Sequence, residues 1–379
     1  MKFGSQLIHG YSSFCPNTGA SSTPIFQAST YHQPDIDCKG KYGYSRMENP
    51  TREALEEAIA NMEGGSNGFA FASGMAAITA VFMLFEQGDH LVICEDVYGG
   101  TFQLATRIMP KFGIEATFVD ATDLDAMEKA IRPNTKAIYL ETPSNPTLRI
   151  TDVRKASTLA KKYDLLTIID NTFMTPYYQR PFELGADIII HSATKFINGH
   201  SDVVAGLVVT KTKELGEQVG FIQINCGSVL GIQDCWLTLR GLKTLKARMD
   251  HSVKSAGIIA EWLSERPEVK KVYYPGLETH EGYEIHQEQA SSSGAVLSFD
   301  VGSKEQVKKL FDAVKIGIVA ISLGGVESIY SYPAQMSHAS MTKEERDKLG
   351  ITEGLIRLSV GLEDTEDILD NLEQAFAQF

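Results

Sequence analysis

The sequence has few cysteines, and no two of them form a close pair. The five are odd in number and include no C-x-x-C motif; they are Cys15, Cys38, Cys94, Cys226 and Cys235. This pattern is typical of reduced thiols in a cytosol rather than of a disulfide framework. The first residues also lack the charged segment and apolar stretch of a signal peptide, so we expect a cytoplasmic protein.

Long apolar runs and basic clusters are missing as well. The longest apolar run, 76–85, contains Thr79 and reaches only about half of the roughly 20 residues that a membrane-spanning helix needs. Acidic residues number 48 against 35 basic ones, a net charge of −13, and nucleic-acid binding needs clustered lysine and arginine. We therefore expect neither a membrane nor a nucleic acid as a partner.

Two familiar nucleotide-binding motifs are absent. There is no G-x-G-x-x-G and no G-x-x-x-x-G-K-[ST], so dinucleotide-binding and P-loop interpretations lose their main support. His280, Glu281 and His286 are expected to lie in a polar loop and lack the spacing of metal ligands. No metal site is expected.

What the sequence does contain is a regular alternation of short apolar runs and helical periodicities. It predicts strands at 68–73, 90–95, 114–120, 136–141, 165–170, 186–191 and 203–210. Helices are expected between them, at 75–85, 101–112, 124–131 and 153–163. Strands that are apolar on both faces and alternate with helices indicate a mainly parallel sheet between two helix layers, a three-layer α/β/α fold.

The two ends of the chain differ from this pattern. The first ~60 residues are rich in turns and aromatic residues, which favours an ordered arm over a disordered tail. A single long helix is expected at 233–263, followed by a smaller α+β region with strands at 269–274, 294–301, 315–320 and 354–360. We therefore expect an arm at 1–60 that contacts a neighbouring subunit, a large domain at 61–240, and a linking helix with the C-terminal domain at 241–379.

Ligands of open α/β sheets gather at the carboxyl ends of the strands, where three features stand out. Ser73, Gly74 and Met75 join a strand to a helix N-terminus, which is either a phosphate site or merely a tight turn. Asp170 ends an apolar strand, either as a functional carboxylate or as an ordinary cap. Lys195 follows Ser192 and Thr194 past another strand, either as a desolvated reactive amine or as a lysine with its head in water.

These features favour one cofactor when they are taken together. Gly74, Met75, Ser192 and Thr194 would hold a phosphate, Lys195 would form a Schiff base, and Asp170 would keep a pyridine nitrogen protonated. Pyridoxal 5′-phosphate (PLP) needs this combination, because its protonated ring draws electrons from the substrate Cα.

The motifs resemble a known family over nearly the whole chain. They are Tyr44-Ser45-Arg46 with Asn49-Pro50-Thr51, Phe71-Ala72-Ser73-Gly74-Met75, Asp96-Val97-Tyr98-Gly99-Gly100-Thr101, Glu141-Thr142-Pro143-Ser144-Asn145-Pro146, Asp170-Asn171-Thr172-Phe173, His191-Ser192-Ala193-Thr194-Lys195, Ser322-Leu323-Gly324-Gly325-Val326-Glu327-Ser328 and Arg357-Leu358-Ser359-Val360-Gly361. The sequence is similar to the Cys/Met metabolism family of PLP-dependent trans-sulfuration enzymes. That resemblance implies the type I, aspartate-aminotransferase-like fold and a large PLP-binding domain.

The resemblance also implies residue roles. Lys195 would carry the cofactor, and Asp170 would pair with its ring nitrogen. Tyr98 would stack on the ring and assist proton transfer. The remaining cofactor contacts would come from Ser73, Gly74, Met75, Asn145, Ser192 and Thr194, and from Tyr44 and Arg46 of a neighbouring subunit in a dimer of dimers. Arg357 would bind the carboxylate of an amino-acid substrate, beside Asn145 and Ser322.

The expected reaction is cleavage of cystathionine by γ-elimination to cysteine, 2-oxobutyrate and ammonia, with β-elimination as a side reaction. One residue departs from the family pattern: Ile321 stands where many γ-acting members have Glu, which can meet the distal amino group of the substrate. This change should relax selection for that group. A β-lyase, a γ-synthase, an O-acetylhomoserine sulfhydrylase, an aminotransferase and a catalytically silent relative remain alternatives.

Overall fold

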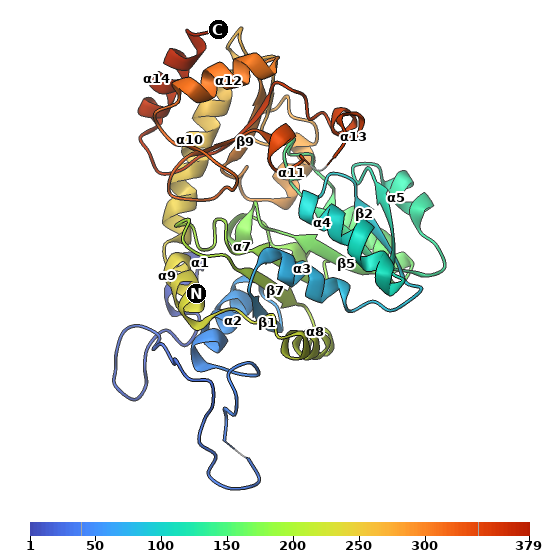
Figure 1. Cartoon of the computed structure of the whole chain (residues 1–379), viewed down its shortest axis with the longest axis vertical. Helices are drawn as coiled ribbons and strands as arrows, with labels where there is room; N and C mark the ends of the chain where they lie inside the picture. Colours follow the sequence, from blue (N-terminus) through green and yellow to red (C-terminus); the bar gives the residue numbers. More distant parts are fainter. Residues whose placement is uncertain (39, 340) are drawn as a thin grey trace.

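The computed structural model describes residues 1–38, 40–339 and 341–379. Its larger sheet has the strand order β1-β7-β6-β5-β4-β2-β3 (Figure 1). The strands are β1 (Asn67–Phe71), β2 (His90–Cys94), β3 (Glu115–Val119), β4 (Thr135–Glu141), β5 (Leu166–Asp170), β6 (Ile188–Ser192) and β7 (Gly206–Thr210). Strand β7 runs antiparallel to both of its neighbours, whereas the pairs from β6 to β3 are parallel. The mainly parallel sheet is confirmed.

Helices cover both faces of this sheet. They are α1 (Phe3–His9), α2 (Pro50–Glu63), α3 (Gly74–Phe82), α4 (Gly99–Gln103), α5 (Leu124–Ala130), α6 (Val153–Lys162), α7 (Thr175–Tyr178), α8 (Lys213–Cys226) and α9 (Ile232–Leu242). In β1, Gly68 lies against the backbone of α2, while the next side chain, Phe69, faces Gly220 of α8. Because successive strand residues point to opposite faces, α2 and α8 lie on opposite sides of the sheet.

Small residues let α3 approach the sheet closely. A Cβ atom on Gly206 of β7 would lie 2.1 Å from the carbonyl oxygen of Ser73, the N-cap of α3. Only glycine leaves room for that backbone. The contact holds the amino end of α3 at the edge where the parallel strands end.

A second sheet of five strands, in the order β10-β11-β12-β9-β8, forms the upper part of the molecule in Figure 1. Its strands are β8 (Lys271–Tyr273), β9 (Val296–Asp300), β10 (Ile318–Val319), β11 (Ile329–Ser331) and β12 (Leu355–Ser359). The accompanying helices are α10 (Leu245–Ser264), α11 (Tyr283–Gln289), α12 (Lys304–Ala313), α13 (Lys343–Lys348) and α14 (Thr365–Phe376). Apolar residues of α10, α12 and α14 form one core with the central strands of this sheet.

Helix α10 belongs to both halves. Leu245 and Met249, near its start, pack in a core with strands of the larger sheet. Ile259 and Leu263, near its end, pack against the smaller sheet. None of the helices in the described part of the chain combines the length and apolar character needed to span a lipid bilayer.

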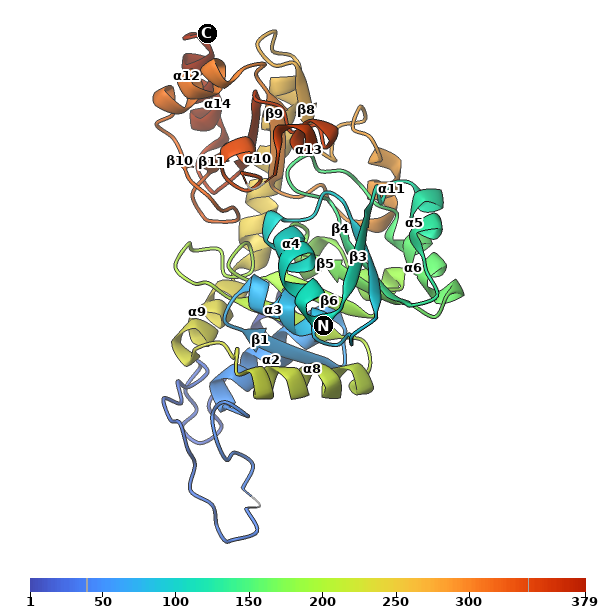
Figure 2. The same ribbon diagram turned by 45° about the vertical axis from the view of Figure 1, so that its right-hand side comes forward.

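The segment between α1 and α2 loops away from the rest of the molecule in both views (Figures 1 and 2). Its described residues, 10–38 and 40–49, form no helix or strand, and their one β-type pairing is an isolated bridge between Thr30 and Tyr44. Helix α2, which follows, packs on the sheet and has Asn49 as its N-cap.

Three details of the sequence interpretation are wrong. The helix expected at 101–112 is divided into α4, a π-helical turn at Leu104–Ile108 and a 3₁₀ turn at Met109–Phe112; Pro110 in the last turn lacks an N–H for a regular helix. The helix expected at 233–263 is broken between α9 and α10, where the Arg248 guanidinium donates to the Gly241 carbonyl. His280 and His286 are buried, with ring nitrogens near carbonyl oxygens, and His286 lies on α11 rather than in a polar loop.

Candidate active site

A cavity of about 270 Å³ lies between the two halves of the molecule, at the carboxyl ends of the parallel strands. It gathers nearly all of the site residues that the sequence indicates. They are Ser73, Gly74, Met75, Tyr98, Asn145, Asp170, Ser192, Thr194, Lys195, Ile321, Ser322 and Arg357. The residues from Ser73 to Lys195 come from the larger sheet and its loops. Ile321, Ser322 and Arg357 come from the smaller sheet and the loop before β11.

Lys195 lies just past β6 and is partly buried. Its Nζ donates a hydrogen bond of 2.8 Å to the Ser322 hydroxyl. Burial, together with the positive charge of Arg357, lowers the pKa of Lys195 to about 8. A larger fraction of the amine is therefore neutral near physiological pH than in an exposed lysine, and the neutral amine is the nucleophilic form.

Two carboxylates lie side by side on neighbouring strands, since Glu141 of β4 pairs with Asp170 of β5. Burial raises the pKa of Asp170; two hydrogen bonds from Thr172 and the charge of His191 oppose that rise. Burial and the nearby Asp170 raise the pKa of Glu141 well above its usual range. Asp170 Oδ1 accepts a 3.0 Å bond from the Thr172 amide, and Glu141 Oε2 accepts one of the same length from the Tyr98 amide.

An anion-binding corner lies at the amino end of α3. The Ser73 hydroxyl caps the helix by accepting from the Ala76 amide at 3.0 Å, which leaves the first two amides of the helix without intrahelical partners. A Cβ atom on Gly74 would come within 3.0 Å of the Ser192 hydroxyl, so glycine keeps this corner open. Free amides, a helix dipole and the Ser192 and Thr194 hydroxyls suit a phosphate group.

Arg357, in the middle of β12, is buried at the other side of the cavity. Its guanidinium donates to Asn145 Oδ1 at 2.8 Å, to the Ser331 hydroxyl at 3.1 Å and to the Ser322 carbonyl. Its buried Nε has no partner within the described residues. Burial lowers the pKa of Arg357 to about 10, against the opposing charge of Glu141. An unused donor on a desolvated guanidinium suits a carboxylate ligand.

Ser322 connects these two cations. Its hydroxyl accepts from Lys195 and its carbonyl from Arg357. Its φ of 147° lies in the region that favours glycine, a strained backbone of the kind that collects at functional sites.

Tyr98 and Ile321 are among the more open residues of the cavity, with exposed fractions of 41% and 70%. Two predicted residues, Tyr44 and Arg46, are not among the described residues that line it. Tyr44 is exposed, and Arg46 donates to the Ile224 carbonyl and lies over the Tyr44 ring. Both belong to the segment between α1 and α2 that loops away from the rest of the molecule, hereafter called the projecting segment.

The sequence interpretation gave no role to Glu141, Thr172 or Ser337, which also line the cavity. Glu141 could have been found, because it ends a predicted strand next to the one that ends in Asp170. Ser337 could not, because it lies in an irregular loop after the 3₁₀ turn Pro333–Gln335, where no periodicity points to the cavity.

The donor set fits PLP: an amine with a lowered pKa, a buried carboxylate and an open anion corner lie in one cavity of a type I α/β fold. The fold and site thus define a PLP-dependent enzyme. The chain belongs to the Cys/Met metabolism PLP-dependent enzyme family, whose model matches residues 4–377. The fold and cofactor expected from the sequence are confirmed.

Similar proteins include two from Bacillus subtilis (strain 168). Its cystathionine β-lyase MetC is 56% identical over 373 residues, covering 98% of this chain and 96% of that protein. Its cystathionine γ-lyase is 53% identical over 375 residues, with 99% of each chain covered. A solved cystathionine γ-lyase from Lactobacillus plantarum, complexed with L-serine, is 48% identical, with a TM-score of 0.97 over 100% of this chain and 99% of that one.

The lowered pKa of Lys195 predicts a pH-dependent cost of burying its charge. In the apoprotein, Lys195→Met should raise the free energy of unfolding at pH 7 by roughly 2 to 3 kcal/mol. The unfolded chain keeps the lysine protonated up to about pH 10.5, whereas the folded chain releases the proton near pH 8. The free energy of unfolding of the wild type therefore rises between about pH 8 and pH 10.5, and its difference from that of Lys195→Met should shrink over this range.

Urea unfolding of both apoproteins from pH 7 to 10.5 measures this difference. Lys308→Met is the matched control, since Lys308 is exposed on α12. A gap that is the same at every pH would contradict the prediction.

Proposed function

We propose that this enzyme is a carbon–sulfur lyase of trans-sulfuration that cleaves cystathionine. The observation that carries the proposal is the single cavity that holds the Lys195 amine 2.8 Å from Ser322 and, beside it, Arg357 with an unused Nε–H. An amino-acid substrate needs both, one group to move protons at its Cα and one to hold its carboxylate. The names of the relatives support cystathionine as the substrate.

When bound, PLP would stabilise negative charge at the substrate Cα. Arg357 would orient the α-carboxylate with help from Asn145, and Lys195 would take the Cα proton. Lys195 would pass that proton on and, as a free amine again, would remove a Cβ proton, while Tyr98 would donate a proton to the departing sulfur. Asp170 would keep the ring nitrogen protonated, and the buried walls would exclude water from these transfers.

We propose γ-elimination as the main reaction: cystathionine and water would give cysteine, 2-oxobutyrate and ammonia. The Ser322-Leu323-Gly324-Gly325 segment, which resembles the γ-acting branch, and the solved γ-lyase support it. β-Elimination to homocysteine, pyruvate and ammonia is the second candidate. It is favoured by the 56% identical B. subtilis relative, which is named a β-lyase.

The keto acid distinguishes the two reactions. The PLP-loaded enzyme is incubated with cystathionine, and the keto acids are separated by chromatography, with Lys195→Ala as the inactive control. We expect mainly 2-oxobutyrate with a smaller amount of pyruvate. Mainly pyruvate would establish the β-lyase instead. Neither keto acid from protein that holds PLP would refute the lyase proposal and direct the test to activated homoserine with a thiol.

Ile321 is proposed to broaden substrate choice, since an apolar side chain at the open side of the cavity offers no charge to a distal ammonium. Ile321→Glu should raise kcat/KM for cystathionine relative to homocysteine by up to about tenfold, an effect that added salt should weaken. Ile321→Gln is the neutral control of similar shape. An equal change in both variants would show that shape, rather than charge, is responsible.

The projecting segment is proposed to complete the cavity of a neighbouring subunit in a homo-oligomer, with Tyr44 and Arg46 reaching the cofactor phosphate. Large apolar side chains support an interface here because they are exposed in the single chain. They are Phe14, Ile25, Phe26, Ile36, Tyr44 and Met47. Leaving so many of them in water is unfavourable.

This arrangement predicts complementation between two inactive variants. Arg46→Ala and Lys195→Ala should each have little activity, but subunits exchanged between them should recover part of it. A mixed pair would contain one cavity with an intact lysine from one chain and an intact arginine from the other. Assays of mixtures after mild denaturation and refolding test this, with separately refolded variants as controls. No recovery in mixtures that do contain mixed oligomers would contradict the shared cavity.

A further inference from the structure

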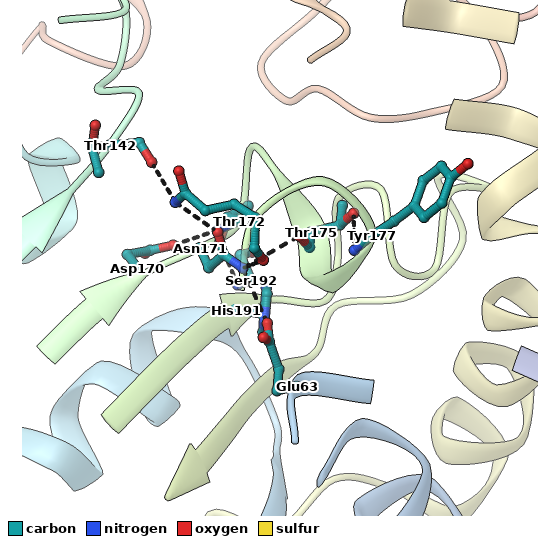
Figure 3. A network of polar contacts seen from close by, with 10 residues as sticks. Glu63, Thr142, Asp170, Asn171, Thr172, Thr175, Tyr177, His191 and Ser192 are labelled. Atoms are coloured by element: carbon teal, nitrogen blue, oxygen red, sulfur yellow. Dashed lines mark hydrogen bonds and ion pairs between the residues drawn. The ribbon is translucent and has the colours of Figure 1, made fainter. Parts of the chain in front are cut away.

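Behind the cavity, on the α2 side of the larger sheet, lies a buried polar cluster that the proposed reaction does not use (Figure 3). It contains Glu63, Thr142, Asn171, Gln179 and His191, all almost fully buried. Glu63 is the last residue of α2, and the others come from the ends of β4, β5 and β6 and the turn after α7.

Glu63 is the centre of this cluster. Its Oε1 accepts from Asn171 Nδ2 at 3.0 Å and lies 2.6 Å from His191 Nε2. Asn171 also exchanges hydrogen bonds with Gln179, whose side chain donates to the Thr142 carbonyl at 3.2 Å. One carboxylate oxygen thus joins the ends of two neighbouring strands, and the amide of Gln179 extends the connection to a third.

Three members of the cluster are immediate chain neighbours of residues that line the cavity. Thr142 follows Glu141, Asn171 follows Asp170, and His191 precedes Ser192. The cavity side has its own link, because the Ser192 amide donates to the Thr172 hydroxyl at 2.8 Å. The strand ends that carry the cavity groups are therefore fixed from both faces of the sheet.

Burying a carboxylate and an imidazole is costly unless they are paired, and here the pairing is incomplete. Glu63 Oε2 and His191 Nδ1 have no hydrogen-bond partner within the described part of the chain. Apolar side chains would fill the same space at lower cost. The location of the pair under Asp170 and Ser192 gives a reason for keeping it.

We propose that Glu63 is a positioning residue for the cofactor: by holding Asn171 and His191 together, it fixes the spacing between Asp170 and Ser192. This inference rests on the proposed roles of those two residues toward the ring nitrogen and the phosphate. The PLP ring is rigid and its phosphate is on a short arm, so its nitrogen and its phosphate can be bound together in one orientation only if the two strand ends keep a narrow range of spacing. A displacement that separates the strands would loosen the cofactor and change its orientation.

The test measures cofactor binding without any substrate, so its outcome is independent of which lyase reaction occurs. Glu63→Ala should weaken PLP affinity by about tenfold or more and should alter the visible circular-dichroism band of the bound cofactor, which reports its asymmetric surroundings. Glu63→Gln, which keeps a carbonyl oxygen acceptor, should restore most of both.

Asn371→Ala controls for a general loss of stability. Asn371 is a buried side chain on α14 that accepts from two backbone amides, those of Lys315 and Ile316. The Asn371→Ala substitution should lower the unfolding temperature but leave PLP affinity and the dichroism band unchanged. If Glu63→Ala leaves the affinity within twofold of wild type and the band unaltered, the proposal is overturned.

If Glu63→Ala does not yield folded protein, PLP affinity and the dichroism band are measured on Asn171→Ala instead. That variant removes the contact of Glu63 with the end of β5 and leaves the Glu63–His191 pair in place. Unchanged affinity and an unchanged band in that variant would equally overturn the proposal.

Discussion

The hydrogen bond between Lys195 and Ser322 is the contact on which the site depends. It joins a residue that follows β6 of the larger sheet to a strained residue of the smaller half. Ser322 also accepts from Arg357, so the amine and the guanidinium are positioned by the same residue. Together with the bond from Arg357 to Asn145, this contact sets the distance between the anion corner of one half and the arginine of the other.

Burial changes the protonation of the charged groups in this cavity. The partly buried Lys195 and the buried Arg357 line it together with two buried carboxylates, Asp170 and Glu141. Desolvation raises the pKa values of the carboxylates and lowers those of the cations. Each group is thereby brought closer to exchanging a proton near neutral pH, which suits a site that must move protons.

Much of the fold and site could be predicted from the sequence because strand ends are local signals. Asp170 and Lys195 each follow an apolar run, and parallel strands bring such ends to one edge. Strand β11 and the break between α9 and α10 could not be predicted, since three residues carry little periodicity and the break depends on Arg248 reaching back to Gly241. The Glu63–Asn171–His191 cluster could not be predicted either, because its members are distant in the chain and no motif joins them.

Helix α10 has a consequence for motion in this enzyme. Its first turns are packed into one core and its last turns into the other, so it acts as a stiff rod clamped at both ends. The smaller sheet carries Arg357, and the loop beside it carries Ser322. A change in the tilt of the rod would therefore carry both toward or away from Lys195 as a unit. The seating of this helix between two cores is therefore a second determinant of the cavity width, beside the Lys195–Ser322 contact.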